Sequence, residues 1–155
     1  GTVERSTFSA AALADRKNAA QHQATERYIT KLRAAKAWSK WEADTVTVLP
    51  RPDVVDHFTS PDVAVAVARI ENHYMANKGW LEEGQLLRDA YKIRGIPGVI
   101  VQGRHDCCTP PRAAWQLKQA WPEVDLQIVP DGGHLFSEPG ILDGLVRATD
   151  RFANS

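Results

Sequence analysis

Two short apolar runs on either side of a helical pattern constrain the fold more than any other part of the sequence. The runs occupy residues 96–101 and 126–129, are rich in β-branched residues, and are bounded by Gly and Pro. Such runs are typical of strands buried on both faces of a sheet. Between them, the apolar spacing over residues 110–121 predicts a helix, with Thr109 as its N-cap and prolines in its first turn. A strand–helix–strand unit places its two strands parallel.

A carboxylate and an imidazole follow these two predicted strands. Asp106 comes after the first strand, and His134 comes after the second, directly behind Gly132 and Gly133. The carboxyl ends of parallel strands share one edge, which is where open α/β sheets place their chemistry. A carboxylate can orient an imidazole and stabilise its cation, so the pattern predicts a catalytic pair with His134 as general base. The alternative is that Asp106 only forms a turn and that Gly-Gly-His is only a loop.

Several motifs together point to one protein family. They are Ala-Ala-Lys-Ala-Trp-Ser-Lys-Trp-Glu at 34–42, Ala-Arg-Ile-Glu-Asn-His-Tyr at 68–74, Gly-Val-Ile-Val-Gln-Gly-Arg-His-Asp at 98–106, Ala-Trp-Gln-Leu at 114–117, Ala-Trp-Pro at 120–122 and Gly-His at 133–134. In content and order they resemble the C-terminal part of proline iminopeptidases, over residues 32–153. These are α/β-hydrolases that remove N-terminal proline from peptides with a Ser-Asp-His triad. The order of Asp106 before His134 agrees with that fold.

The resemblance implies an α/β fold class, namely the C-terminal portion of an α/β-hydrolase. We expect a helical cap segment over 32–94, followed by a βαβ unit and a final helix within 95–155. Residues 1–31 lie outside the resemblance and are rich in good helix formers with a thin apolar face, so we predict a weakly packed helical segment there. Within the cap, we predict a loop over 43–60 and a single amphipathic helix over 82–94.

Glu71 is unusual because it shares an apolar helical stripe with Val63 and Val67. A carboxylate in such a place is costly unless it is paired or hydrogen-bonded. One interpretation is a buried salt bridge, with Arg69 or with another arginine.

The resemblance implies a second interpretation, in which Glu42 and Glu71 bind the amino group of a peptide with N-terminal proline. Such a ligand carries a secondary ammonium and an apolar ring, so its pocket needs carboxylates and aromatic walls. Trp41 and Tyr74 are the predicted walls, and Trp38 and Trp80 are also available.

The nucleophile elbow of the family, Gly-x-Ser-x-Gly, is absent from these 155 residues. The six serines, none with glycine at both elbow positions, are Ser6, Ser9, Ser39, Ser60, Ser137 and Ser155. Asp106 and His134 would therefore orient a nucleophile that this sequence does not contain. Two functions remain open. The chain is either the acid–base part of a serine aminopeptidase that is inactive alone, or a non-catalytic binding or interaction module of the same fold.

Two parallel strands do not make a normal free-standing sheet, because parallel sheets need cover on both faces and several strands. We therefore expect either loose packing or association, with a second copy or with a complementary N-terminal hydrolase fragment. An exposed strand edge would favour such pairing.

Charge and hydropathy exclude several other classes of function. Lys and Arg number 19, as do Asp and Glu, and no basic stripe occurs, so we predict no nucleic-acid partner. No apolar run approaches the roughly 20 residues of a membrane span, and no signal peptide is recognised, so we expect no membrane association and a cytoplasmic location.

Cys107 and Cys108 are adjacent, which strains a disulfide between them, so we expect free thiols in a reducing compartment. Together with His105 they lie too close in sequence for a tetrahedral zinc site, and no fourth ligand is obvious. We predict no metal and no cofactor. A cysteine nucleophile would need His134 within hydrogen-bond reach, whereas the resemblance gives this loop to the acid Asp106.

Overall fold

The structure, a computed structural model, describes the backbone of residues 10–153 and the side chains from residue 18 onward. Its sheet has two parallel strands, β1 (Gly98–Gly103) and β2 (Val124–Val129), with Gly98 opposite Val124 and Gly103 opposite Val129. Helix α5 (Pro111–Ala120) connects them. The predicted βαβ unit is thus confirmed.

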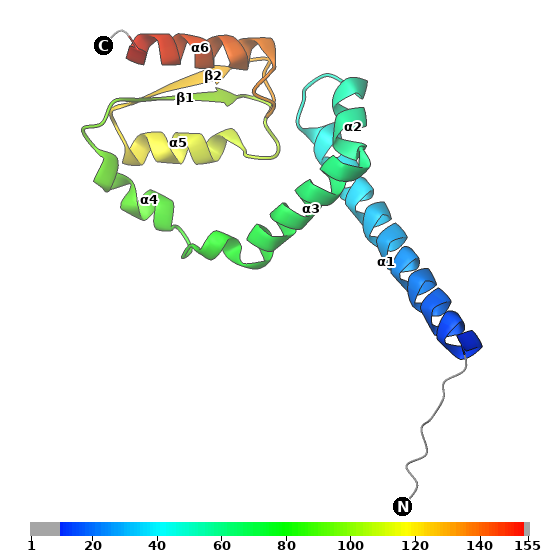
Figure 1. Cartoon of the computed structure of the whole chain (residues 1–155). Helices are drawn as coiled ribbons and strands as arrows, with labels where there is room; N and C mark the ends of the chain where they lie inside the picture. The colour runs from blue at the N-terminus through cyan, green and yellow to red at the C-terminus, as the bar shows by residue number, and fades with distance from the viewer. Residues whose placement is uncertain (1–9, 154–155) are drawn as a thin grey trace, which may run out of the picture.

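Helices cover the sheet on both faces. Figure 1 shows α5 on one face and the last helix, α6 (Pro139–Ala153), on the other. Gly144 lets α6 approach closely, because a Cβ added there would lie 2.9 Å from a methyl carbon of Val101. Val124 is fully buried between the layers, while Leu142, Leu145 and Val146 of α6 stay largely exposed. The apolar face of α6 is therefore wider than the sheet it covers.

Three helices form most of the cap: α1 (Ala10–Thr45), α2 (Pro52–Thr59) and α3 (Pro61–Ala76), with α1 packing against both others. Their buried cluster consists of Ala43, Val46 and Val54, and Cys108 and Leu135 from the α/β part pack against it. In Figure 1 the carboxyl edge of the sheet faces this side of the cap. The end of α1 therefore lies where the strand loops emerge.

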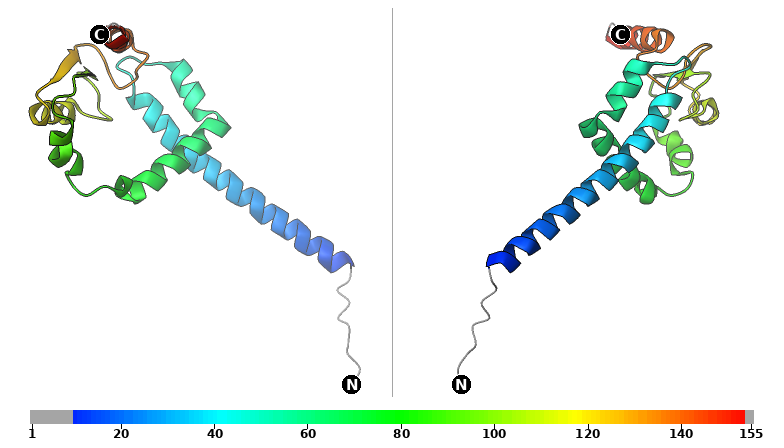
Figure 2. Two further views of the ribbon diagram at one scale, coloured as in Figure 1. Left: turned by 60° about the vertical axis from the view of Figure 1, so that its left-hand side comes forward. Right: turned by 90° about the vertical axis from the view of Figure 1, so that its right-hand side faces the viewer.

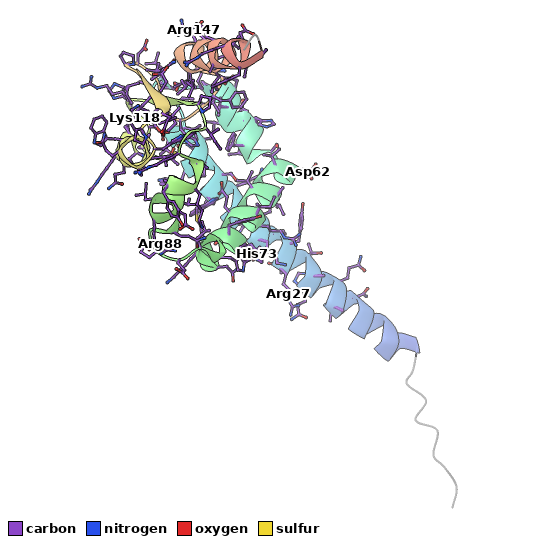
Figure 3. The ribbon with its side chains drawn as sticks, turned by 90° about the vertical axis from the view of Figure 1, so that its left-hand side faces the viewer. Arg27, Asp62, His73, Arg88, Lys118 and Arg147 are labelled. Atoms are coloured by element: carbon purple, nitrogen blue, oxygen red, sulfur yellow. The ribbon has the colours of Figure 1, made fainter. Side chains whose placement is uncertain are left out.

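Most of α1 toward its N-terminus extends beyond the other elements (Figure 2). Residues 18–28 are all exposed, and Arg27 is labelled on this part in Figure 3. The predicted N-terminal helical segment and the start of the cap segment form one continuous helix, α1, which agrees with their helix-forming composition. The predicted segment 1–31 includes nine residues that lie outside the described part. No helix within residues 10–153 is both long enough and apolar enough to cross a membrane.

The predicted loop over 43–60 is wrong. Helix α1 continues to Thr45, and α2 occupies most of the remainder. Pro52 lies in the first turn of α2, where a missing N–H costs nothing, and Asp53 follows it near the positive end of the helix. The prolines thus mark a helix start, and buried Val54 anchors it to the cap.

The predicted helix over 82–94 is also wrong as a single element. The structure has a short α4 (Gln85–Asp89) that passes into a 3₁₀ turn, η2 (Ala90–Ile93). Ala90 is buried, but Leu86 and Tyr91 are exposed. Because most helical stability in proteins comes from packing of an apolar face, little supports a longer helix here. Before α4 lies a second 3₁₀ turn, η1 (Lys78–Trp80), in which Gly79 has a positive φ of 59°.

Candidate active site

Asp106 lies in the loop after β1 and is held by a dense set of donors. The backbone N–H groups of Cys108 and Thr109 donate to Oδ1 at 3.0 and 2.8 Å. The Thr109 hydroxyl donates to Oδ2 at 2.8 Å, and the Gln102 amide donates to the same oxygen at 3.2 Å. The carboxylate is only 7% exposed. Thr109 is therefore not the N-cap that we predicted for α5, a position that Pro110 occupies; its donors serve Asp106 instead.

These hydrogen bonds decide the ionisation of Asp106. Burial by itself raises the pKa of the carboxyl group, but the bonds from Thr109 and His134 and the charge of His134 outweigh it. The net pKa lies below its usual value, so Asp106 is a carboxylate at neutral pH. A buried, ionised and oriented acid is what a neighbouring imidazolium needs.

His134 follows β2 on a loop that lies against the loop of Asp106. A Cβ added at Gly103 would lie 1.9 Å from the carbonyl oxygen of Gly133, so glycine at the end of β1 allows this approach. The N–H groups of His134 and Leu135 both donate to the carbonyl of Val46, at 2.9 and 2.8 Å. The histidine loop is thus tied to the residue that follows α1.

Glu138 adds a second connection between this loop and the cap. Its carboxylate accepts from the N–H of Gly133 at 2.5 Å and from the N–H of Val48 at 3.1 Å. Sequence reasoning missed this role of Glu138, and also that of Val46. The only local signal in the sequence is the helix start at Pro139, next to Glu138. That signal does not indicate a hydrogen bond to Val48, which is 90 residues away.

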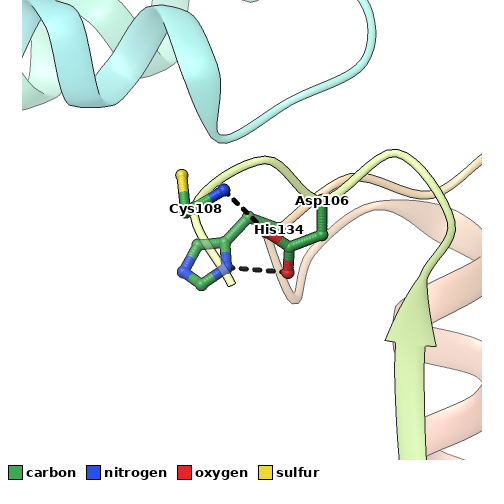
Figure 4. Close-up of side chains that lie close together, drawn as sticks. All are labelled: Asp106, Cys108 and His134. Atoms are coloured by element: carbon green, nitrogen blue, oxygen red, sulfur yellow. Dashed lines mark hydrogen bonds and ion pairs between the residues drawn. The ribbon is translucent and has the colours of Figure 1, made fainter. Parts of the chain in front are cut away.

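The predicted acid–histidine pair comes together. His134 Nδ1 lies 3.0 Å from Asp106 Oδ2, and 3.2 Å from the hydroxyl of Thr109 (Figure 4). With Nδ1 as the donor to the carboxylate, the second ring nitrogen, Nε2, is the basic one. This arrangement can accept a proton at Nε2 and stabilise the resulting cation.

Glu42 lies in the last turns of α1, and its pKa is raised. The largest cause is burial, the negative charge of Glu71 adds to it, and His134 partly opposes it. Glu42 thus lies within electrostatic range of both Glu71 and His134. Of the two predicted amine-binding carboxylates, Glu42 is therefore the one near the predicted catalytic histidine.

Glu71 has a partner that differs from the expected arginine. The indole N–H of Trp38 donates to Glu71 Oε2 at 2.5 Å. The Trp38 ring also packs against Trp41, with ring centroids 5.6 Å apart. Trp41 is 57% exposed, so much of its ring is open to solvent.

Tyr74 lies in a separate aromatic cluster on α3 and η1. Its ring makes an edge contact with Trp80 at 5.2 Å, and His73, labelled in Figure 3, contacts Trp80 at 5.1 Å. Tyr74 and Trp38 both line a groove of about 1140 Å³ between α1 and α3. The groove therefore connects Tyr74 to the indole that binds Glu71.

Both cysteines are free in the structure, and Cys108 is half-buried. Potential metal-ligating atoms of Asp106, Cys108 and His134 lie within 4.8 Å of one another (Figure 4). This set differs from the one considered in the sequence, because Asp106 and His134 take the places of His105 and Cys107. The Cys108 thiol does not have the properties of an activated nucleophile, because burial raises its pKa and its hydrogen-bond partner is Thr45.

Comparisons with known proteins agree with this geometry. A sequence model of the alpha/beta hydrolase fold family matches residues 7–140, so the match includes most of the N-terminal segment that the resemblance did not reach. A proline iminopeptidase of Xanthomonas citri is 53% identical over 125 residues, 80% of this chain and 40% of the relative. That of Xylella fastidiosa strain Temecula1 is 50% identical over 124 residues, and that of Arabidopsis thaliana is 46% identical over 119.

The chain spans about 40% of the length of the two bacterial relatives and 31% of the plant one. Its parallel βαβ unit, with the acid and the histidine on adjacent loops at the carboxyl edge, is the part of the fold expected from such a match. The chain therefore belongs to the α/β-hydrolase fold family.

Proposed function

We propose that the chain supplies the acid–base pair and the amine-binding cap of a serine-type aminopeptidase that releases N-terminal proline from peptides. The observation that carries the proposal is the 3.0 Å contact between His134 Nδ1 and the buried carboxylate of Asp106. The names of the relatives support the choice of substrate.

In this proposal the reaction is an acyl transfer. A serine from a region outside these 155 residues attacks the carbonyl carbon of the first peptide bond, while His134 Nε2 takes its hydroxyl proton. His134 then gives that proton to the departing peptide amine, and water later repeats the sequence to release proline. Asp106 stays ionised throughout and stabilises the imidazolium, in keeping with its lowered pKa.

The cap would set where the peptide is cut. A proline amino terminus is a secondary ammonium, and the paired carboxylates Glu42 and Glu71 offer it two counter-charges. Burial and, next, the charge of Glu71 raise the pKa of Glu42, which supports a site that a bound cation would stabilise. Trp41, and Tyr74 from the groove between α1 and α3, would contact the ring. Holding the amine at a fixed distance from His134 would place the first peptide bond at the catalytic pair.

A complementary N-terminal hydrolase fragment is the proposed partner, with self-association as the other form of assembly. Leu142, Leu145 and Val146 on α6 have exposed apolar side chains. This exposure supports a partner that packs against α6 and covers them. The two free thiols support a reducing, cytoplasmic location.

The test is hydrolysis of a chromogenic proline amide by the purified chain, alone and mixed with the N-terminal half of a related enzyme. We expect activity only in the mixture, and we expect His134→Ala to abolish it. The matched control is His57→Ala, an exposed histidine on α2 that should leave activity unchanged. Activity of the chain alone would refute the assignment of the nucleophile to another region.

A non-catalytic module remains the second candidate, because the sequence has no elbow serine and Ser39 is fully buried. A folded mixture that binds proline amide but does not hydrolyse it would favour this function.

A further inference from the structure

We propose that Cys108, His134 and Asp106 form a binding site for a thiophilic divalent cation such as Zn²⁺. The three side chains come from two loops, and Cys108 and His134 are 26 residues apart in the sequence. Their potential ligand atoms nevertheless lie within 4.8 Å of one another. Thiolate, imidazole and carboxylate are together the ligand types that zinc prefers. The sequence disfavoured a metal because its candidate ligands were confined to residues 105–108, and the fold supplies the missing one.

The end of α1 holds both loops in place. Cys108 Sγ lies 3.6 Å from the hydroxyl and 3.9 Å from the carbonyl oxygen of Thr45. His134 is fixed through its backbone N–H on the carbonyl of Val46, at 2.9 Å. Because neighbouring residues of the same segment position both loops, the thiol and the imidazole are close together before any cation binds.

The geometry needs only a small contraction. Zinc bonds of about 2.0 to 2.3 Å in a tetrahedral site put ligand atoms roughly 3.3 to 3.8 Å apart. The contraction from 4.8 Å lies within the reach of a side-chain rotation, since the His134 side chain is 40% exposed. A water molecule can complete the coordination.

Binding changes the proton inventory in a defined way. The cation takes the place of the proton between His134 Nδ1 and Asp106 Oδ2, and the imidazole keeps its proton on Nε2 instead. The thiol of Cys108 loses its proton to solvent, so one proton leaves per cation bound. Neither oxidation nor reduction occurs.

A metal-bound His134 has no free basic nitrogen, so the cation would block proton transfer. This consequence rests on the proposed function, whereas binding of the cation does not. The two can therefore fail independently, and the test below measures binding alone.

The test is a titration of the purified 155-residue chain with Co²⁺, followed by absorption. We expect a thiolate-to-cobalt charge-transfer band and the visible bands of a tetrahedral site, both removed by Zn²⁺ and unaffected by Mg²⁺, which prefers oxygen ligands. Cys108→Ser should remove the thiolate band and weaken Zn²⁺ binding by at least about 100-fold, and His134→Gln should weaken it by a similar factor.

Cys107→Ser is the matched control, because it removes an adjacent and more exposed thiol. It should keep the band. Absence of a thiolate band in the unmodified chain, or its persistence in Cys108→Ser, would overturn the proposal. Equal loss in Cys107→Ser would also overturn it, because the site would then be the cysteine pair rather than the mixed set.

Alkylation of the unmodified chain gives a measurement that does not depend on the folding of variants. We expect Zn²⁺ to slow modification of Cys108, detected by peptide mass analysis, while Cys107 reacts at an unchanged rate. Equal rates at Cys108 with and without Zn²⁺ would contradict the proposed site.

Discussion

Gly103 is the residue at which the two loops of the candidate site meet, and its replacement by alanine tests their proximity. An added Cβ would lie 1.9 Å from the carbonyl oxygen of Gly133 and 2.6 Å from that of Gly132. Both atoms belong to the backbone, so no side-chain rotation can relieve the overlap. The loops must separate, which strains two hydrogen bonds of 2.9 Å, from Arg104 N–H to Val129 and from His105 N–H to Gly132.

The expected loss of stability follows from these contacts. Overpacking of a well-packed site costs about 1–3 kcal/mol, and each weakened hydrogen bond costs about 1 kcal/mol, so Gly103→Ala should lose about 3–5 kcal/mol. With a urea dependence of about 2 kcal/mol per molar, the unfolding midpoint should fall by roughly 1.5–2.5 M. The measurement is urea unfolding of the full chain, followed by circular dichroism.

Gly95→Ala is the matched control for this experiment. Gly95 has a φ of 87°, but no atom lies within 4 Å of an added Cβ. Only the backbone conformation is then penalised, by about 1–2 kcal/mol. If Gly103→Ala unfolds at the same urea concentration as Gly95→Ala, the two loops are not in contact as described, and the reasoning fails.

Three further substitutions test the site. Trp38→Phe removes the indole N–H from Glu71 and should cost about 1–3 kcal/mol in urea unfolding; an unchanged midpoint would show that the bond contributes nothing. Thr109→Val removes the hydroxyl that donates to Asp106. Because the pKa of Asp106 is lowered in the folded state, its ionised form stabilises the fold above about pH 3.9, and this stabilisation is lost as the pH falls through the folded pKa. With the donor removed, acid unfolding should begin at a higher pH. Glu42→Gln should stabilise the chain near neutral pH. Because the pKa of Glu42 is raised in the folded state, ionisation of this carboxyl group above about pH 4.3 destabilises the fold. A gain in stability that persists at pH 3, where the carboxyl group is protonated, would contradict this cause.

Local patterns were sufficient for the strands and for the acid–histidine pair. The apolar runs ending at Gly103 and Val129 are short, β-branched and bounded by Gly or Pro, so they have one plausible state, and a parallel βαβ connection then places Asp106 beside His134. Thr109 is different. Its position before two prolines indicates an N-cap, but the nearby carboxylate of Asp106 competes successfully for its N–H and hydroxyl.

The incorrect prediction of a loop over 43–60 has an identifiable cause. Pro50 and Pro52 favour a loop there, but proline is well tolerated in the first turn of a helix, the position that Pro52 occupies in α2. The pairing of Glu71 with Trp38 was not predicted either, because an indole donor on α1 and a carboxylate on α3 meet only when the two helices cross.

The sequence by itself determined the two strands, the helix between them, and an acid and a histidine at one edge of a sheet. These follow from residue type and spacing over short distances, which local conformational preference and chain connectivity govern. Only the tertiary structure decided that the end of α1 joins that edge. There the carbonyl of Val46 accepts from the histidine loop, and Cys108 packs into the cap beside His134. The physical reason is that a backbone carbonyl and a half-buried thiol have no sequence signature for their partners, which depend on how the cap packs against the sheet.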